Sequence, residues 1–99
     1  MAFFLAIALL YSAPQYTGIL WIHSESCEPC KRMEPVINKL VVEGQPIVVK
    51  KIPFTREAFR EEGIRGVPTT IQYQDGKEVQ RQVGYMDEKS LRAMLQKGK

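Results

Sequence analysis

Residues 18–30 read GILWIHSESCEPC, and the other elements of the chain can be placed relative to this segment. Residues 18–23 are almost continuously apolar, which is typical of a central strand that is buried on both faces of a sheet. A polar loop follows, and it leads to Cys27 and Cys30 at the start of a helix that we expect to cover residues 31–42. Two thiols that are separated by two residues at a strand-to-helix junction can close a small disulfide ring.

The segments after this junction alternate between strand and helix patterns. The helix presents one apolar stripe, formed by Met33, Val36, Ile37, Leu40 and Val41. A second β-rich run, residues 47–52, completes a βαβ unit whose two strands should be parallel. A short helix capped by Thr55, a hairpin turning at Asp75-Gly76 and a last helix capped by Asp87 follow. We therefore predict an α/β fold of order β-α-β-α-β-β-α, a four-stranded mixed sheet with helices on both faces.

The N-terminal part of the chain is unusually apolar, since the first 22 residues carry no charged side chain. Residues 3–11 have the apolar character of a secretory signal, but no Lys or Arg precedes them. The run is also too short to span a bilayer, which needs about 20 apolar residues. The alternative is an extra element that packs on the domain. We divide the chain into residues 1–16, which are either a signal or tether remnant or a packed element, and a domain of residues 17–99. The uncharged start slightly favours an extracytoplasmic location over a cytoplasmic one.

Composition narrows the class of protein. A chain of 99 residues with 44% apolar and 25% charged residues fits one globular domain, which we expect to be a monomer. The net charge of +3 is spread among acids, so we predict no nucleic-acid surface. Two cysteines are too few for a disulfide scaffold, and with His23 as the single histidine a four-ligand zinc site lacks donors. A redox pair that needs no further cofactor is the remaining use of both thiols.

The chemistry expected of this pair follows from its position on the helix. The nucleophile in disulfide exchange is a thiolate, and unpaired N–H groups at a helix N-terminus stabilise negative charge on Cys27. Lys31 adds to this effect, while the adjacent carboxylate of Glu28 opposes it. Pro29 suits the first helical turn and stiffens the ring. Cys30 lies one turn further in, so we assign Cys27 as the solvent-facing attacking thiol and Cys30 as the more buried resolving thiol.

A second motif, Val67-Pro68-Thr69, stands at the start of a later strand. A proline there cannot donate a ladder hydrogen bond, so an ordinary strand-start proline is one interpretation. In the other interpretation Pro68 is cis and packs beside Cys27, and the backbone of Val67 is free to pair with an extended substrate.

Together these motifs resemble the thioredoxin family over residues 17–97. The resemblance rests on Cys27-Glu28-Pro29-Cys30-Lys31, Pro35 at the helix kink, residues 63–69, Asp75-Gly76-Lys77 and Val83-Gly84. It implies a thioredoxin-like fold and a cis Pro68. It also implies a thiol–disulfide oxidoreductase in which protein substrates form a mixed disulfide on Cys27 that Cys30 resolves. Substrate contacts are then expected at Pro29, Val67, Pro68 and Gly84.

The chain departs from the family pattern at several positions. The family usually has Gly-Pro between the cysteines, where this chain has Glu28-Pro29, and a tryptophan where Ser26 stands. The position of the family's buried acid falls at Trp21, and the family's first strand and helix are either missing or cut down to the short N-terminal run. Because redox potentials of Cys-x-x-Cys proteins span about 150 mV, both a reducing and an oxidising direction remain open.

Two other functions stay open at this point. A glutathione-using, glutaredoxin-like enzyme would have a Gly-Gly-x-Asp type of segment where residues 84–87 read GYMD. A non-enzymatic module would hold Cu(I) with His23, Cys27 and Cys30, although a local hydrogen-bonding role for His23 is the simpler interpretation. For the leading function we expect electrons from an upstream thiol, a flavin reductase or a membrane donor.

Overall fold

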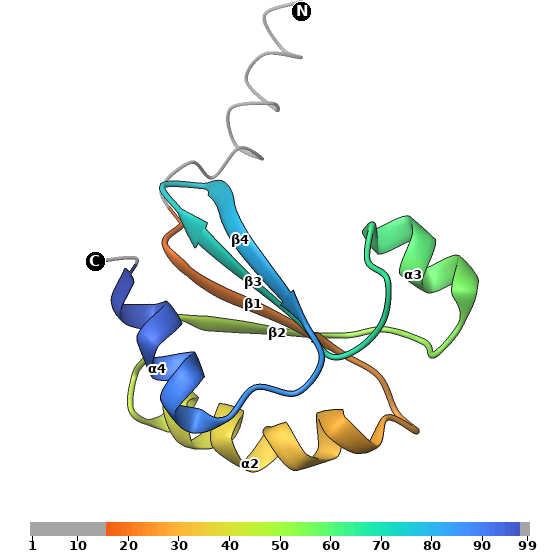
Figure 1. The fold of residues 1–99 in the computed structure, drawn as a ribbon, viewed down its shortest axis with the longest axis horizontal. Helices are drawn as coiled ribbons and strands as arrows, with labels where there is room; N and C mark the ends of the chain where they lie inside the picture. The colour runs from red at the N-terminus through yellow and green to blue at the C-terminus, as the bar shows by residue number, and fades with distance from the viewer. Residues whose placement is uncertain (1–15, 98–99) are drawn as a thin grey trace, which may run out of the picture.

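The computed structural model describes residues 16–97, in which four strands form a mixed sheet with helices on both faces (Figure 1). The elements are β1 (Gly18–His23), α2 (Glu28–Val42), β2 (Ile47–Lys51), α3 (Arg56–Glu62), β3 (Thr69–Gln74), β4 (Lys77–Val83) and α4 (Glu88–Lys97). The strand order is β2-β1-β3-β4, with β1 parallel to β2 and both other pairs antiparallel. The predicted order and mixed sheet are confirmed. The predictions for residues 1–15 lie outside the described residues.

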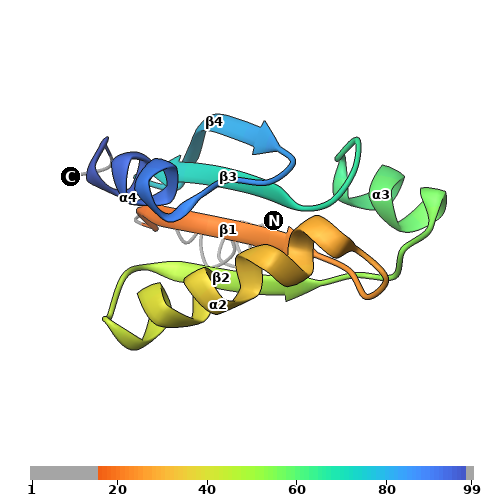
Figure 2. The same ribbon diagram turned by 60° about the horizontal axis from the view of Figure 1, so that its bottom comes forward.

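The two faces of the sheet carry separate apolar clusters. On one face α2 and α4 pack against Ile19 and Trp21 of β1, and Figure 2 shows α2 running along β1 and β2. On the other face Ile22 and Ile71 pack beside α3. Successive side chains of a strand point to opposite faces, so β1 contributes to both clusters. This central strand therefore fixes where the loop after His23 delivers the two cysteines.

The helix α2 ends at Val42 as predicted, but its start and one residue of its apolar stripe differ from the prediction. It begins at Glu28, three residues before the expected start, because Cys27 is its N-cap and Pro29 fits in the first turn. Val41 is 43% exposed, so its predicted place in the buried stripe is wrong. At 3.6 residues per turn, the position eight residues after Met33 has rotated away from the sheet.

The predicted turns and caps are present. The Ala58 N–H donates to the Thr55 hydroxyl at 3.1 Å, and the Ser90 N–H donates to the Asp87 carboxylate at 2.9 Å. The hairpin turns through Asp75 and Gly76, whose φ angles of 54° and 81° match a two-residue turn with both central residues left-handed. None of the described helices is long and apolar enough to cross a membrane.

An ion-pair cluster ties the end of α2 to α4. The Arg92 guanidinium donates to both carboxylate oxygens of Glu43 at 2.9 Å, and it also lies 2.8 Å from the Glu88 carboxylate. Lys39 adds a contact of 3.1 Å to Glu88. The two cations thus share two carboxylates, and the ion pairs join α2 to α4. Because these pairs are exposed, salt in the solution screens them strongly.

This cluster predicts a pH dependence of stability. The hydrogen bonds from Arg92 hold the pKa of Glu43 and of Glu88 below the ordinary range. A depressed carboxyl pKa stabilises the fold fully above the unfolded value of about 4.3, and this contribution disappears as the pH falls through the folded value. We expect the urea midpoint of Arg92→Gln to decrease less than that of wild type when the pH is lowered. Lys89→Gln, which removes the same charge from the same helix, should show the same decrease as wild type. Identical pH profiles for Arg92→Gln and wild type would contradict the assignment.

Candidate active site

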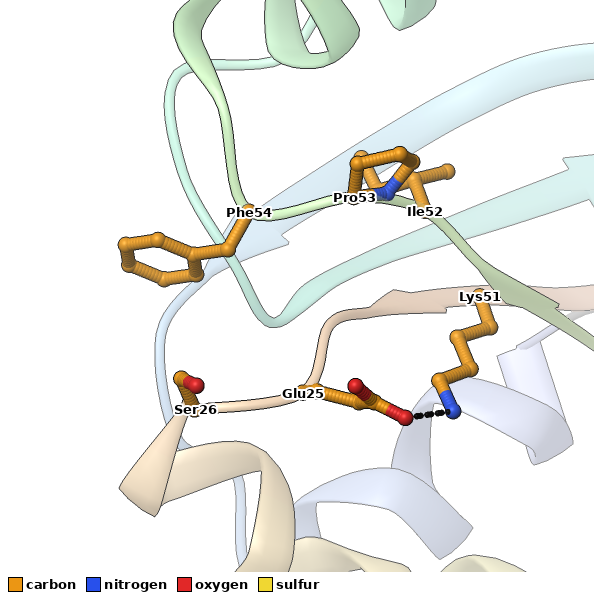
Figure 3. A pocket seen from close by; sticks show the side chains of 6 residues that line it. All are labelled: Glu25, Ser26, Lys51, Ile52, Pro53 and Phe54. Carbon is orange, nitrogen blue, oxygen red and sulfur yellow. Dashed lines mark hydrogen bonds and ion pairs between the residues drawn. The ribbon is translucent and has the colours of Figure 1, made fainter.

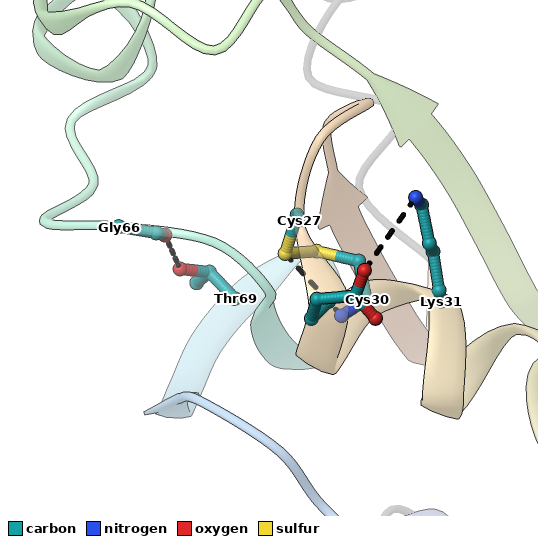
Figure 4. Close-up of a disulfide and its surroundings, with 6 residues drawn as sticks. Cys27, Cys30, Lys31, Gly66 and Thr69 are labelled. Carbon is teal, nitrogen blue, oxygen red and sulfur yellow. Dashed lines mark hydrogen bonds and ion pairs between the residues drawn. A yellow bond between two sulfur atoms is a disulfide. The ribbon is translucent and has the colours of Figure 1, made fainter.

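The two cysteines form a disulfide at the N-terminus of α2 (Figure 4). Their Cα atoms are 5.2 Å apart. Cys27 is extended, with φ −116° and ψ 102°, and its Sγ accepts the Cys30 N–H at 3.3 Å. The sulfur therefore lies at the N-terminal end of the helix, beside its first N–H groups, one of which donates to it. On reduction, the same groups and the helix dipole would favour a thiolate at Cys27.

The exposure of the two cysteines differs from the prediction. Cys27 is 3% exposed and Cys30 is 1% exposed, so both are buried in the disulfide form. The expectation that Cys27 faces solvent is wrong for this form, because its sulfur turns toward the helix instead of outward. Both cysteines belong to the apolar cluster on the α2 and α4 face, together with Met33 and Met86.

The segment with Pro68 lies on the Cys27 side of the disulfide, as Figure 4 shows for residues 66–69. The Val67–Pro68 peptide bond is cis, which confirms this part of the second interpretation, while pairing of the Val67 backbone with a substrate stays a prediction. Val67 packs against the cluster that contains the cysteines. The Gly84 N–H donates to the Pro68 carbonyl at 2.8 Å, and the Thr69 hydroxyl donates to the Gly66 carbonyl at 2.6 Å. Three of the predicted substrate-binding residues are thus adjacent, and their binding role remains a prediction.

The residues predicted to tune the pair lie at its exposed rim. Lys31 and Glu28 approach to 3.7 Å, with side chains 62% and 81% exposed. Exposed pairs of this kind contribute little to stability. Pro29 is half-buried in the first helical turn. A net tuning effect of Glu28 and Lys31 therefore remains a prediction that the geometry does not strengthen.

An open hollow of about 560 Å³ lies beside Ser26, the residue that precedes Cys27 (Figure 3). The Lys51 ammonium binds the Glu25 carboxylate at 2.6 Å on one side of it. Phe54, which is 56% exposed, lines the hollow and contacts Phe59 edge-on at a centroid distance of 5.6 Å. No sequence signal points to Phe54, because it lies in the loop between β2 and α3, where no periodicity assigns a side chain to a face.

A second cavity, of about 310 Å³, has Cys30, His23 and Ser24 among its lining residues. The His23 ring stacks on Trp21, with centroids 4.5 Å apart and planes 9° from parallel. The pKa of His23 is lowered, chiefly by burial and further by Lys51, while Glu34 acts in the opposite direction. Strand alternation offered a signal for this arrangement, since His23 must share the face of Trp21.

The residues of the copper hypothesis do not gather into a ligand set. Within residues 16–97, no three His, Cys, Asp or Glu side chains are grouped so that they could hold a metal ion. His23 is instead engaged in the stack on Trp21, and both sulfurs are joined to each other.

The sheet order and the disulfide at a helix N-terminus beside a cis proline define the thioredoxin-like class of protein. A family model described as a thioredoxin-like domain matches residues 10–99, and the chain belongs to the thioredoxin family. Thioredoxin from Chlamydia muridarum is 37% identical over 79 residues, covering 75% of this chain and 74% of that protein. Thioredoxin from Bacillus subtilis is 30% identical over 74 residues, covering 72% and 71%. The X-ray structure of Fasciola hepatica thioredoxin superposes with a TM-score of 0.70 at 24% identity, covering 95% and 91%.

Proposed function

We propose that this chain is a thiol–disulfide oxidoreductase that exchanges electrons with disulfides of protein substrates. The observation that carries the proposal is the Cys27–Cys30 disulfide at the N-terminus of α2, beside the cis Pro68 segment. The Cys27 thiolate attacks one sulfur of a substrate disulfide, and the other substrate sulfur leaves as a thiolate. Cys30 then attacks the Sγ of Cys27, which restores the protein disulfide and releases the second substrate thiol.

The substrate is expected to bind as an extended segment along residues 67–68. A free backbone at Val67 would pair with it, as in other cases of strand addition, and Gly84 and Pro29 would flank the reacting sulfur. We propose protein dithiols and disulfides as partners, acted on by a monomer that binds no nucleic acid. Electrons would come from an upstream thiol, a flavin reductase or a membrane donor. An extracytoplasmic location, favoured by the apolar N-terminal run, would imply the membrane donor.

Cys30→Ser should convert the reaction into a trap. Without the resolving thiol, the mixed disulfide on Cys27 has no intramolecular route to break down. We expect reduced Cys30→Ser, mixed with insulin, to form a covalent adduct that accumulates and disappears with dithiothreitol. Non-reducing electrophoresis and mass spectrometry of the adduct check this. The matched control is the double variant Cys27→Ser/Cys30→Ser, which should form none. An adduct of similar yield in the double variant, or none in Cys30→Ser, would contradict the assigned roles.

The direction of exchange is set by the redox potential of the pair. Natural Cys-x-x-Cys proteins span about 150 mV, which is about 7 kcal/mol for two electrons. A titration of Cys27 and Cys30 in glutathione buffers, read by alkylation and mass spectrometry, measures this value. A potential near about −270 mV supports a reductase, and one near about −120 mV supports an oxidant.

A further inference from the structure

The cavity beside Cys30 contains the groups needed to move a proton. Cys30 lines it, together with His23 at the end of β1 and Ser24 in the following loop. Ser24 is 3% exposed, and its hydroxyl oxygen is buried without a hydrogen-bond partner among the described residues. A buried hydroxyl without a partner is costly, and a cavity of about 310 Å³ lined mainly by polar and charged residues has ample room for water. The cavity therefore offers a place for water between a buried thiol, a hydroxyl and an imidazole.

We propose that His23 accepts the proton of the Cys30 thiol, through water held at the Ser24 hydroxyl, when Cys30 resolves the mixed disulfide. This inference rests on the proposed function, because it concerns the second step of that reaction. Cys30 is 1% exposed in the disulfide form, so the cavity is the side from which water reaches its sulfur. A buried thiol in an apolar cluster resists ionisation, and a nearby base is what would make it a nucleophile.

The other charged groups around the cavity are less suited to this role. Glu25 is held in an ion pair by Lys51, which lowers the pKa of its carboxyl and makes it a weak base. Lysine side chains offer hydrogen-bond donors and no acceptor, so Lys51 and Lys31 do not supply the base. Glu34, on the exposed side of α2, faces His23 and raises the affinity of the imidazole for a proton.

His23 has the properties of a proton acceptor at this position. Burial and Lys51 lower its pKa against the opposing effect of Glu34, so the imidazole is neutral near pH 7. Its stack on Trp21 fixes the plane of the ring. Trp21 stands at the position of the buried acid in the thioredoxin family pattern. Its indole N–H is only a hydrogen-bond donor, so Trp21 does not accept the proton.

The step balances as follows. The Cys30 S–H bond breaks and its proton passes through water to the imidazole, which becomes cationic. The Cys30 thiolate forms a bond to the Cys27 sulfur, and the bond from Cys27 to the substrate sulfur breaks with its electron pair. The substrate leaves as a thiolate, which takes up a proton from the imidazolium or from solvent. The two protein sulfurs are oxidised, and the substrate disulfide is reduced by two electrons over the whole reaction.

Stopped-flow mixing of the reduced protein with one equivalent of dithiobis(nitrobenzoate) separates the two steps. Each step releases one coloured nitrothiobenzoate, the first by attack of Cys27 and the second by attack of Cys30. Nitrothiobenzoate leaves without needing a proton, so the second release reports deprotonation of Cys30. We expect His23→Gln to slow the second release by at least about tenfold and to leave the first unchanged. The pH inflection of wild type, expected below the ordinary histidine value of about 6.5, should disappear in this variant.

Two further variants distinguish proton transfer from packing. His23→Glu supplies a different proton acceptor and should recover much of the second rate, whereas Glu34→Gln should keep the rate and move the inflection to lower pH. A second release in His23→Gln with the rate and pH dependence of wild type would overturn the inference. So would a His23→Glu variant as slow as His23→Gln. In both cases a normal first release would leave the proposed function standing, and loss of the first release in wild type would contradict that function itself. Circular dichroism of each variant verifies the fold.

Discussion

Replacing Cys27 with serine is expected to reduce disulfide exchange to the rate of the reagent thiol alone. The serine hydroxyl keeps its proton at neutral pH and cannot act as the attacking thiolate, so the first step is lost. We expect the second-order rate constant for insulin reduction to fall by at least about 10³-fold, as for removal of other covalent nucleophiles. The initial rate of insulin turbidity at several protein concentrations measures it.

The matched control for this prediction is Ser26→Ala, which changes the adjacent exposed residue and leaves both thiols in place. It should retain a rate constant within a few-fold of wild type, since Ser26 is exposed and carries no thiol. If Cys27→Ser reduced insulin as fast as Ser26→Ala, Cys27 would not be the nucleophile. The Cys30→Ser trap would then be expected to fail as well.

Replacing Trp21 with alanine is expected to have the largest effect on stability. Trp21 is 1% exposed and lies between the sheet and α2, within the cluster that also contains the disulfide. Truncation of such a side chain leaves a cavity that the neighbours fill only partly, and the free energy of unfolding should fall by about 3–5 kcal/mol. Urea unfolding followed by far-ultraviolet circular dichroism measures this. Tryptophan fluorescence does not serve, because Trp21 is the single tryptophan of the chain.

Val42→Ala is the control for Trp21→Ala. Val42 is 86% exposed at the end of α2, so its truncation should change the free energy of unfolding by no more than about 0.5 kcal/mol. A loss below about 1 kcal/mol in Trp21→Ala would show that the side chain is not part of a tightly packed core. It would also remove the support that the stack on Trp21 gives to the orientation of His23.

Most of the fold was accessible from the sequence because its signals are local. The apolar run of β1, the Thr55 and Asp87 caps and the Asp75-Gly76 turn each specify one element, and short connections leave few ways to order them. The start of α2 was placed three residues late, since the apolar stripe begins after the capping residue. Val41 fits the helical period of the apolar stripe of α2 but is exposed, because the stripe extends beyond the surface that buries the rest of it.

The candidate site was predictable in part. The spacing of Cys27 and Cys30 and the Val67-Pro68-Thr69 motif identified its two halves, and the structure places them side by side. The burial of Cys27 was not predictable, because it depends on the rotamer that points its sulfur at the Cys30 N–H. The cavity at Ser24 depends on how a loop, a helix and a strand edge meet, which no single segment encodes.

The most direct test of the exchange centre is a quenched-flow experiment on the wild-type protein. The reduced chain is mixed with excess insulin, quenched in acid at successive times, alkylated and analysed by mass spectrometry. We predict a transient mixed disulfide between insulin and Cys27. The Cys27–Cys30 disulfide should follow, together with an equal amount of insulin in which one disulfide has been reduced to two thiols. Persistence of both free thiols in the presence of insulin, or a first adduct on Cys30, would contradict this account.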